Sequence, residues 1–182
     1  LFFQGIVEPS RGLDVAIKLM KYLKNSLLII AGQDRDNYIE ELKRLTAELE
    51  VENKVIFTGF MPSDQLLIYS YYADILVYFG NKSVKNMDLT IPNKMFDYIM
   101  AGKPIICSNL KSLEKLITKR NIGLTVDICA QDIYFNAKKI QEFIDDKYLI
   151  KRCMDNINKI QNQYSWENQE RELLNLYEKL KI

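Results

Sequence analysis

The most informative absence in this sequence is histidine, which does not occur once among its 182 residues. Without histidine the chain has no imidazole general base and no catalytic triad built on one. The three cysteines, Cys107, Cys129 and Cys153, form no CxxC pair, so a Cys/His zinc site and a disulfide framework are both disfavoured. We therefore predict no metal and no cofactor, and a reducing compartment.

An excess of charge of either sign is also absent, because 25 Lys and Arg residues stand against 24 Asp and Glu residues. No strong overall field attracts nucleic acid or an anionic membrane surface, so we expect no nucleic-acid partner. No apolar run is long enough to span a bilayer, and no charged segment precedes a hydrophobic one as in a secretion signal. These absences predict a cytoplasmic location.

The sequence has no initiator methionine and opens on "LFFQG", which is typical of the interior of a strand. The same letters resemble the scar of a protease-cleaved tag, which is the alternative interpretation. Phe2 and Phe3 continue naturally into "IVEPSRGLD", and this continuity favours native sequence. A chain of this length can bury one sizeable hydrophobic core, so we expect residues 1–182 to be a single domain. The start of the sequence indicates a domain cut from a longer protein.

Apolar runs alternate with amphipathic segments along the chain. The apolar runs predict strands at 1–5, 26–32, 54–60, 74–79, 104–108 and 122–126. The amphipathic segments predict helices at 12–23, 36–50, 62–73, 92–101 and 110–120, with a loop at 80–91 and a helical tail from about 129. Strands that are apolar throughout are expected where helices cover both faces of a parallel sheet. The order predicts a doubly wound, Rossmann-like α/β fold.

Ligands of such folds bind beyond the carboxyl ends of the strands. We therefore expect a cleft formed by the loops at 5–12, 59–62, 80–94 and 108–113. In the first loop, Arg11 precedes a helix whose dipole disfavours a cation. An anion between the arginine and the helix would explain the arrangement, and a solvated surface arginine is the alternative.

The stretch "IPNKMFDYIMAGKPII" carries the second group of polar candidates. Pro92 suits the first turn of a helix, and Asn93 and Lys94 place polar groups at its N-terminal end. Asp97 lies three residues after Lys94, so the two share a face. A cation and a carboxylate together suit a ligand with both phosphate and vicinal hydroxyls, and a plain surface ion pair is the alternative.

Six stretches occur in the order of one known family: "GIVEPSRGLDVAI", "LLIIAG", "VIFTGFMPSDQLLIYSYYADILV", "PNKMFDYIMAGKPIICS", "IGLTVD" and "YSWENQERELLNLYEKL". Together they resemble the C-terminal half of retaining glycosyltransferases of family 4, which have the GT-B fold. The resemblance implies the domain that binds a nucleoside-diphosphate sugar as substrate. It also implies an N-terminal acceptor domain that this sequence lacks. Any association with the inner face of a membrane would be made by that domain.

By the same resemblance, the basic residue of the family's (K/R)G motif, which contacts the donor diphosphate, falls on Arg11, beside Gly12. The strand-ending Gly5 is followed by Ile6, where the family often has a second basic residue. One of the two basic residues that the family often has at this site is therefore absent, and Lys94 is the candidate to replace it. Arg11 and Lys94 are the expected catalytic residues, because they would neutralise charge on the leaving nucleoside diphosphate.

The family's E-x7-E signature ends in a Glu that binds the ribose hydroxyls, and Asp97 occupies that place. Counting back gives Leu89 where the first Glu would be, with Asp88 adjacent. The acid near the donor sugar is therefore missing or displaced, and Asp88 is the candidate for it. The "PNK" stretch resembles a subfamily of polysaccharide-building enzymes that departs from the signature in the same way.

Several aromatic residues have both a binding and a packing interpretation. Phe60 and Met61 follow the "TG" that in the family leads into the base-binding loop, so they are candidates to line the nucleobase; a core position for Phe60 is the alternative. Tyr69, Tyr71, Tyr72 and Tyr78 could either stack on nucleic-acid bases or pack against the protein core. Their helical spacing and the near-zero net charge of the chain favour packing. Trp166 begins the last amphipathic helix, which in relatives braces the other domain, so we expect an exposed apolar strip on it.

The sequence thus predicts a donor domain of a glycosyltransferase that passes a sugar to an acceptor hydroxyl in polysaccharide or glycan biosynthesis. Retention of configuration is implied by the resemblance, and we expect the domain alone to be inactive. A GT-B-type sugar-nucleotide epimerase is one alternative, although those enzymes usually bring histidines to the site. A non-catalytic nucleotide-binding or assembly module is the other, and the missing first Glu favours it.

Overall fold

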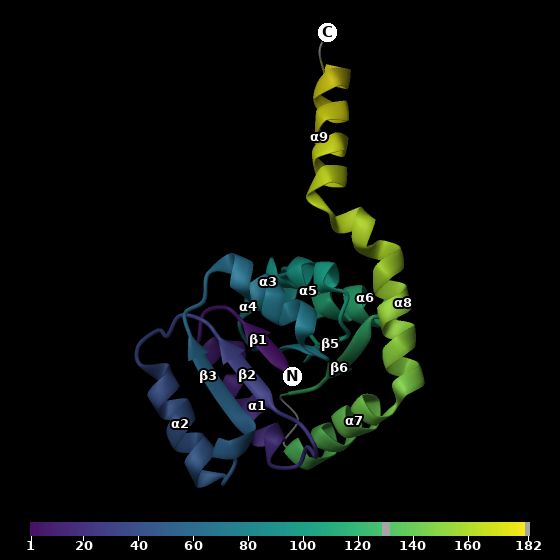
Figure 1. Ribbon diagram of the computed structural model, residues 1–182. Helices are drawn as coiled ribbons and strands as arrows, with labels where there is room; N and C mark the ends of the chain where they lie inside the picture. The colour runs from purple at the N-terminus through teal and green to yellow at the C-terminus, as the bar shows by residue number, and fades with distance from the viewer. Residues whose placement is uncertain (129–131, 181–182) are drawn as a thin grey trace.

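The computed structural model describes residues 1–128 and 132–180, and these residues form a six-stranded parallel sheet (Figure 1). The strands are β1 (Phe2–Gln4), β2 (Leu28–Ala31), β3 (Val55–Gly59), β4 (Leu76–Tyr78), β5 (Ile105–Ser108) and β6 (Gly123–Val126). Their order across the sheet is β3-β2-β1-β4-β5-β6. The chain therefore winds outward from β1, returns across it and winds outward on the other side, which confirms the predicted doubly wound fold.

Helices cover both faces of the sheet. The longer ones are α1 (Leu13–Met20), α2 (Tyr38–Glu48), α3 (Ser63–Tyr72), α5 (Lys94–Ala101), α6 (Lys111–Arg120), α7 (Ile133–Asp145), α8 (Lys147–Tyr164) and α9 (Trp166–Leu180). Right-handed crossovers place α1 and α2 on one face and α3, α5 and α6 on the other. Helix α7 packs beside α1, and α8 runs on to pack against α5, so the tail passes around the end of the sheet.

The periodic patterns are explained by burial on these two faces. The apolar stripe of α1, with Leu13, Ile17 and Met20 among its members, is buried against the sheet. Both phenylalanines of β1 are 1% exposed, as a strand covered on both faces requires.

One polar residue interrupts this apolar core, and it ties three elements together. Gln4 in β1 is only 5% exposed. Its side-chain oxygen accepts a hydrogen bond from Ser70 Oγ of α3 (2.8 Å), and its Nε2 donates to Asp97 Oδ2 of α5 (2.9 Å). The backbone N–H of Gln4 donates to the Tyr98 hydroxyl (3.3 Å). A polar side chain buried with its hydrogen bonds made fixes the position of its partners, here Asp97 above all.

Three details differ from the sequence prediction or complete it. The loop predicted at 80–91 contains a short helix, α4 (Lys85–Leu89), which buries Met87. The helix predicted at 92–101 begins at Lys94, with Asn93 as its N-terminal cap residue. Cys107 and Cys153 are buried free thiols, whereas Cys129 lies outside the described residues.

The last helix projects from the body (Figure 1), and α9 has no buried residue. The predicted exposed apolar strip is present, because Trp166, Leu173, Leu174, Tyr177 and Leu180 are all exposed. Over residues 1–128 and 132–180, no helix is both long enough and apolar enough to cross a membrane.

Candidate functional site

The loops that follow the strands are bonded to one another at the carboxyl edge of the sheet. The backbone N–H of Asn81, after β4, donates to the Ser10 carbonyl, after β1 (3.1 Å). Gly32 N–H, after β2, donates to the Gly59 carbonyl at the end of β3 (2.8 Å). Ser108 Oγ, at the end of β5, donates to the Gly80 carbonyl (2.8 Å). The four loop segments named from the sequence therefore meet along one edge.

Arg11 lies at the end of a single 3-10 turn, η1 (Pro9–Arg11), directly before α1. The following residue, Gly12, has φ of 65°, and a Cβ there would lie 2.1 Å from the Phe79 carbonyl oxygen, so only glycine allows this close approach. Arg11 Nε lies 3.0 Å from Glu8 Oε1, but this ion pair does not satisfy hydrogen-bond geometry. The Nε–H group consequently lacks an acceptor among the described residues.

Glu8 is an acid that the sequence analysis did not consider. Its carboxylate pairs with Arg35 (2.7 Å) as well as with Arg11, and it accepts a hydrogen bond from Ser10 Oγ (2.8 Å). Burial acts to raise the pKa of Glu8, but the hydrogen bond from Ser10 and the charges of Arg11 and Arg35 outweigh it, so the pKa is lowered. Glu8 therefore stays ionised and orients Arg11.

Lys94 points inward from the first turn of α5, over the end of β1. Its Nζ lies 4.1 Å from the ring centroid of Phe3 and 5.1 Å from that of Tyr78. A Cβ at Gly5 would lie 2.5 Å from this Nζ, so the glycine leaves room for the ammonium. Burial first, and then the charge of Arg11, lower the pKa of Lys94 to about 7, against the opposing effects of Asp97 and Glu8. The Lys94 ammonium is thus held where its charge is unfavourable.

Three buried side-chain nitrogen or oxygen atoms of the described residues have no hydrogen-bond partner: Arg11 Nε, Tyr78 Oη and Lys94 Nζ. All three can donate a hydrogen bond, and all three lie at the carboxyl ends of β1 and β4. Unsatisfied buried groups are rare in folded proteins, because each forfeits the hydrogen bonds it makes with water. A cluster of donors without acceptors, two of them on basic side chains, matches an anionic ligand.

Asp97 lies beside this donor cluster, one turn into α5, and is half-buried. Burial raises the pKa of Asp97, while the hydrogen bond from Gln4 and the charge of Lys94 act to lower it. Its Oδ2 is held by Gln4, and its Oδ1 bonds to no described residue. Asp97 and Lys94 are close but form no ion pair in the part of the chain that the structure describes. The sequence-level alternative of a plain surface ion pair is therefore wrong.

The remaining candidates have different surroundings. Phe60 is 73% exposed, so the alternative that placed it in the core is wrong. Met61 is partly buried against the core, and Asn93 is exposed at the start of α5. Asp88 is buried, and both of its carboxylate oxygens contact Lys111. Oδ1 accepts a hydrogen bond from the backbone N–H of Lys111 (3.0 Å), and Oδ2 lies 3.5 Å from the Lys111 Nζ. Asp88 thus caps α6, which accounts for its burial.

Two polar residues of the site were not singled out from the sequence. Gln4 is a polar residue inside an otherwise apolar strand, and that interruption was a usable signal. Tyr78 was grouped with the neighbouring tyrosines as packing. It is fully buried, whereas Tyr69, Tyr71 and Tyr72 are exposed. Tyr69 still stacks on the buried Phe2, so the packing prediction fails for Tyr71 and Tyr72.

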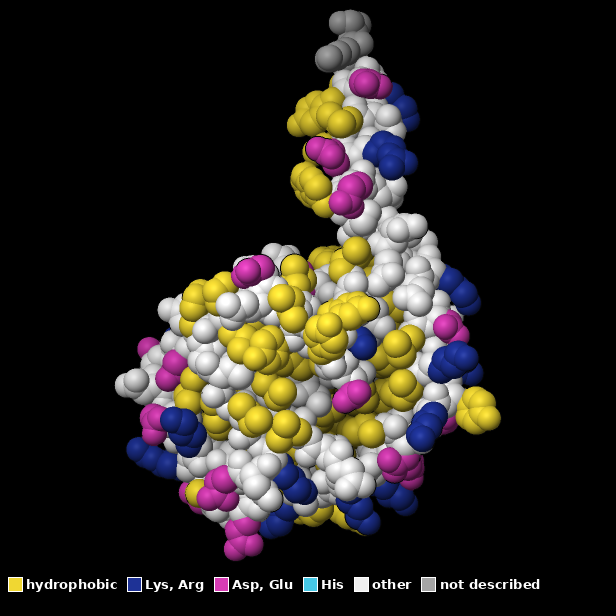
Figure 2. Space-filling view, viewed as in Figure 1, with side chains coloured by type: hydrophobic (Ala, Val, Ile, Leu, Met, Phe, Trp, Pro, Cys, Tyr) yellow, Lys and Arg dark blue, Asp and Glu magenta, His cyan; other side chains and the backbone are white. Residues whose placement is uncertain are grey.

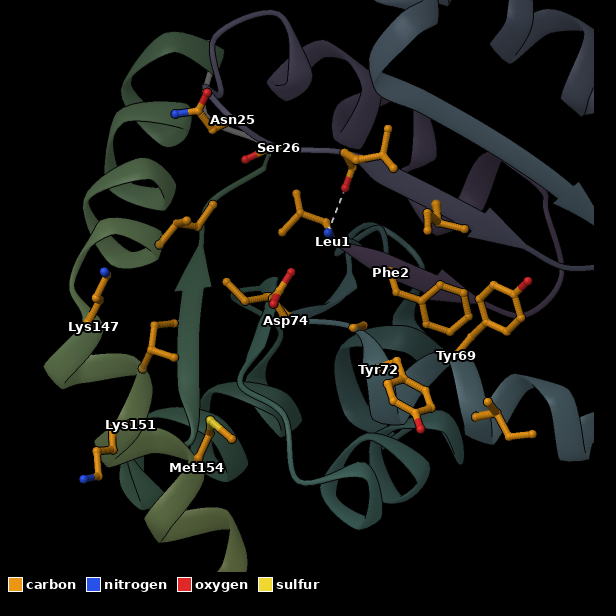
Figure 3. Close-up of a pocket in the computed structure, with 17 residues that line it drawn as sticks. Leu1, Phe2, Asn25, Ser26, Tyr69, Tyr72, Asp74, Lys147, Lys151 and Met154 are labelled. Carbon is orange, nitrogen blue, oxygen red and sulfur yellow. Dashed lines mark hydrogen bonds between the residues drawn. The ribbon is translucent and has the colours of Figure 1, made fainter.

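A groove with a volume of about 840 Å³ lies at the opposite, amino edge of the sheet, and the sequence did not predict it. Figure 3 shows Tyr69 and Tyr72 of α3 on one side and Met154 of α8 on the other, with Leu1 between them. Figure 2, which has the viewpoint of Figure 1, shows apolar side chains gathered over the central part of the body. The unsatisfied donors lie at the other edge, so the groove is a separate feature from the donor cluster.

Comparisons with known sequences agree on one family. The model of the family described as Glycosyl transferases group 1 matches residues 1–163. The uncharacterized glycosyltransferase MJ1607 of Methanocaldococcus jannaschii is 26% identical over 182 residues, which cover 97% of this chain and 44% of that protein. The putative glycosyltransferase YtcC of Bacillus subtilis is 27% identical, covering 87% of this chain and 40% of that protein. The chain spans less than half the length of both relatives.

Solved structures share the fold. The C-terminal domain of a glycosyl transferase group 1 family protein (LpcC) from Francisella tularensis matches with a TM-score of 0.74 and 16% identity, over 91% of this chain and 85% of that one. Anabaena Alr3699/HepE in complex with UDP-glucose matches with a TM-score of 0.73 and 18% identity, over 96% of this chain and 48% of that one. At these identities the likeness establishes the architecture alone.

The buried ammonium of Lys94 predicts an unusual dependence of stability on pH. The pKa of Lys94 is about 7 in the folded protein and about 10.4 in an unfolded chain. Between these values the unfolded state binds more protons, so the free energy of unfolding rises with pH, by up to about 1.4 kcal/mol per pH unit from this group. Lys94→Met should remove that slope and be more stable than the parent near pH 7.

Urea unfolding at pH 6.5 and pH 9.5 measures the effect, with Lys85→Met as the control because Lys85 is exposed. The control should keep the slope of the parent protein. Equal slopes for the parent and Lys94→Met would show that Lys94 is not held in this destabilised state.

Proposed function

Because this chain belongs to the glycosyl transferases group 1 family, we propose that it binds a nucleoside-diphosphate sugar at the carboxyl edge of its sheet and gives up the sugar to an acceptor hydroxyl. The observation that carries the proposed site is the cluster of three buried donor atoms on Arg11, Tyr78 and Lys94. A diphosphate supplies both the acceptor oxygens and the negative charge that these donors lack.

The chemistry follows from where charge develops during the transfer. When the bond between the sugar and the diphosphate breaks, negative charge grows on the nucleoside diphosphate. Arg11 and Lys94 oppose that charge from a site with little water, where a fixed cation acts more strongly than in bulk solvent. A bound diphosphate favours the protonated form of Lys94, so the residue carries its charge when the ligand is present. Both residues therefore stabilise the leaving group.

Asp97 is the proposed ribose ligand. Its Oδ2 is already engaged by Gln4, which leaves Oδ1 to accept hydrogen bonds from the two vicinal hydroxyls. An ionised carboxylate makes stronger hydrogen bonds than a neutral oxygen does. Gly5 and Gly12 belong to the proposed binding loop: Gly5 leaves room for Lys94, and Gly12 lets the loop pack closely against Phe79. Asn93 adds a polar group at the start of α5.

The nucleobase would lie toward the loop after β3, where the exposed ring of Phe60 and the side chain of Met61 offer apolar surface. The choice of base rests on backbone contacts to a large extent, so residue identities do not determine it. The match to Anabaena HepE, which is described as a complex with UDP-glucose, makes uridine nucleotides the first probes to use.

The acceptor would be held by the part of the protein outside this chain. The chain covers 44% of MJ1607, so a segment of similar size remains for a second domain. The apolar strip of α9, exposed here, would pack against that domain. We place the complete enzyme in polysaccharide or glycan biosynthesis in the cytoplasm, with retention of configuration and with any membrane contact through the second domain.

A nucleotide-binding module without transfer activity is the second candidate function. Leu89 stands where the first acid of the signature is expected, and the adjacent Asp88 is engaged in capping α6. Turnover by the complete protein with a panel of nucleotide sugars separates the two candidates. Sugar transfer supports the enzyme, whereas nucleotide binding with no transfer to any acceptor hydroxyl supports the module.

Arg11 should contribute to the binding of the diphosphate and not to that of the nucleoside. Hydrogen bonds to charged groups are worth roughly 1.5–3 kcal/mol, so Arg11→Ala should weaken the best of UDP, GDP and ADP by about 10- to 100-fold. The affinity for the matching nucleoside should stay the same. Titration calorimetry on wild-type and variant protein measures both constants.

Arg35→Ala is the matched control for Arg11→Ala. Arg35 pairs with the same Glu8 carboxylate but has a side chain that is 55% exposed. Its removal should leave the ratio of diphosphate to nucleoside affinity unchanged. If Arg11→Ala weakens nucleoside and diphosphate equally, Arg11 does not contact the diphosphate.

Asp97→Asn keeps the shape of the side chain and removes its charge, so nucleotide affinity should fall by about tenfold, or about 1.4 kcal/mol. The melting temperature should change little. Asp88→Asn is the matched control: weakening the cap of α6 should lower the melting temperature and leave UDP-type affinity unchanged. Unchanged affinity with a lower melting temperature for Asp97→Asn would make Asp97 a structural acid.

A further inference from the structure

The hydroxyl of Tyr78 lies at the point where β1 and β4 separate. The two strands pair only at Phe2 and Leu76, so they diverge toward their carboxyl ends. Tyr78, the last residue of β4, has 0% of its surface exposed, and its hydroxyl lies under the next loop, 2.6 Å from where a Cβ of Gly80 would be. The neighbours of β1 in the sheet are β2 on one side and β4 on the other, and ligands of doubly wound sheets bind at this reversal.

Lys94 lies over the region where the two strands separate, which we call the crevice between β1 and β4. Its Nζ lies over both the Phe3 ring of β1 and the Tyr78 ring of β4, at 4.1 Å and 5.1 Å from the two centroids. The side chain of lysine has four flexible carbons, so it can turn outward without any change in the backbone of α5. That rotation uncovers the space beside Gly5 and over the Phe3 and Tyr78 rings, which the ammonium fills in this structure.

A second tyrosine in the same core shows what a purely structural hydroxyl looks like in this fold. Tyr98 is also 0% exposed, but its hydroxyl accepts from the Gln4 backbone N–H (3.3 Å) and donates to the Val77 carbonyl (3.2 Å). The hydroxyl of Tyr78 makes no hydrogen bond of good geometry with the described residues, and the nearby Arg11 guanidinium can only donate to it, so the proton of the hydroxyl has no acceptor there. Since packing alone requires only the ring, a buried hydroxyl without a partner indicates that a partner is supplied from outside the protein.

We propose that Tyr78 is a substrate-binding residue: with Lys94 turned outward, its hydroxyl donates a hydrogen bond to a phosphate oxygen of the nucleoside diphosphate in the crevice between β1 and β4. Arg11 and Lys94 donate to the same diphosphate from the rim. The inference rests on the proposed function, because it names a further residue of that site. Burial raises the pKa of Tyr78 despite the lowering effect of Arg11, so the phenol stays neutral and can donate.

The test compares Tyr78→Phe with Tyr98→Phe, since each variant removes one buried hydroxyl and keeps the ring. Titration calorimetry gives the affinity of wild-type protein and of both variants for UDP, GDP and ADP and for the matching nucleosides. Tyr78→Phe should lose about tenfold in diphosphate affinity, keep its nucleoside affinity and show no fall in melting temperature. Tyr98→Phe should show the reverse: a lower melting temperature and an unchanged ratio of the two affinities.

The wild-type protein provides a second measurement that does not depend on the folding of a variant. With tyrosine labelled at the ring carbon that bears the hydroxyl, saturating diphosphate should shift the signal of Tyr78 and leave that of Tyr98 in place. An unchanged affinity ratio in Tyr78→Phe, or an unshifted Tyr78 signal, overturns the inference while the proposed function stands. Wild-type protein that binds none of the three diphosphates rejects the proposed function, and the role of Tyr78 with it.

Discussion

The divergence of β1 from β4 is the constraint on which the rest of the site depends. A doubly wound sheet must reverse its direction somewhere, and here the reversal falls beside β1, where only one residue pair joins the two strands. The two strands consequently separate toward the carboxyl edge and form the crevice, while the loops that follow them stay joined by the hydrogen bond from Asn81 to the Ser10 carbonyl. Arg11 comes to this crevice from the loop after β1, Tyr78 from the end of β4, and Lys94 from the first turn of α5.

The same crevice shows how stability and function are divided between residues. Gln4 makes hydrogen bonds to Ser70 and Asp97 across three elements, so a polar network in the core fixes the position of the Asp97 carboxylate. Lys94, a few ångströms away, is left with an ammonium that burial destabilises. A preorganised binding site needs both features: a hydrogen-bonded network that holds its side chains in place, and nearby donors that lack acceptors. A ligand then supplies the acceptors without rearranging the network.

The sequence determined much of the fold and part of the site. Alternating apolar runs predicted the strands and helices, because burial on both faces leaves a clear pattern, and loops at one edge then brought Arg11, Lys94 and Asp97 together. The sequence predicted a cleft at this edge but did not indicate which strands are neighbours, so the separation of β1 from β4, the buried hydroxyl of Tyr78 and the groove at the amino edge could not be foreseen. The short α4 was missed because one helical turn carries almost no periodicity.

The most direct test of the account is a crystal structure of the protein with the nucleoside diphosphate that stabilises it most among UDP, GDP and ADP. A ligand at a hundredfold excess over its dissociation constant adds about 2.7 kcal/mol of stability, so a thermal screen selects it reliably. The account predicts phosphate oxygens within hydrogen-bond distance of Arg11 and Lys94, and ribose hydroxyls on Asp97. A nucleotide bound in the groove between α3 and α8, at the amino edge, would contradict it.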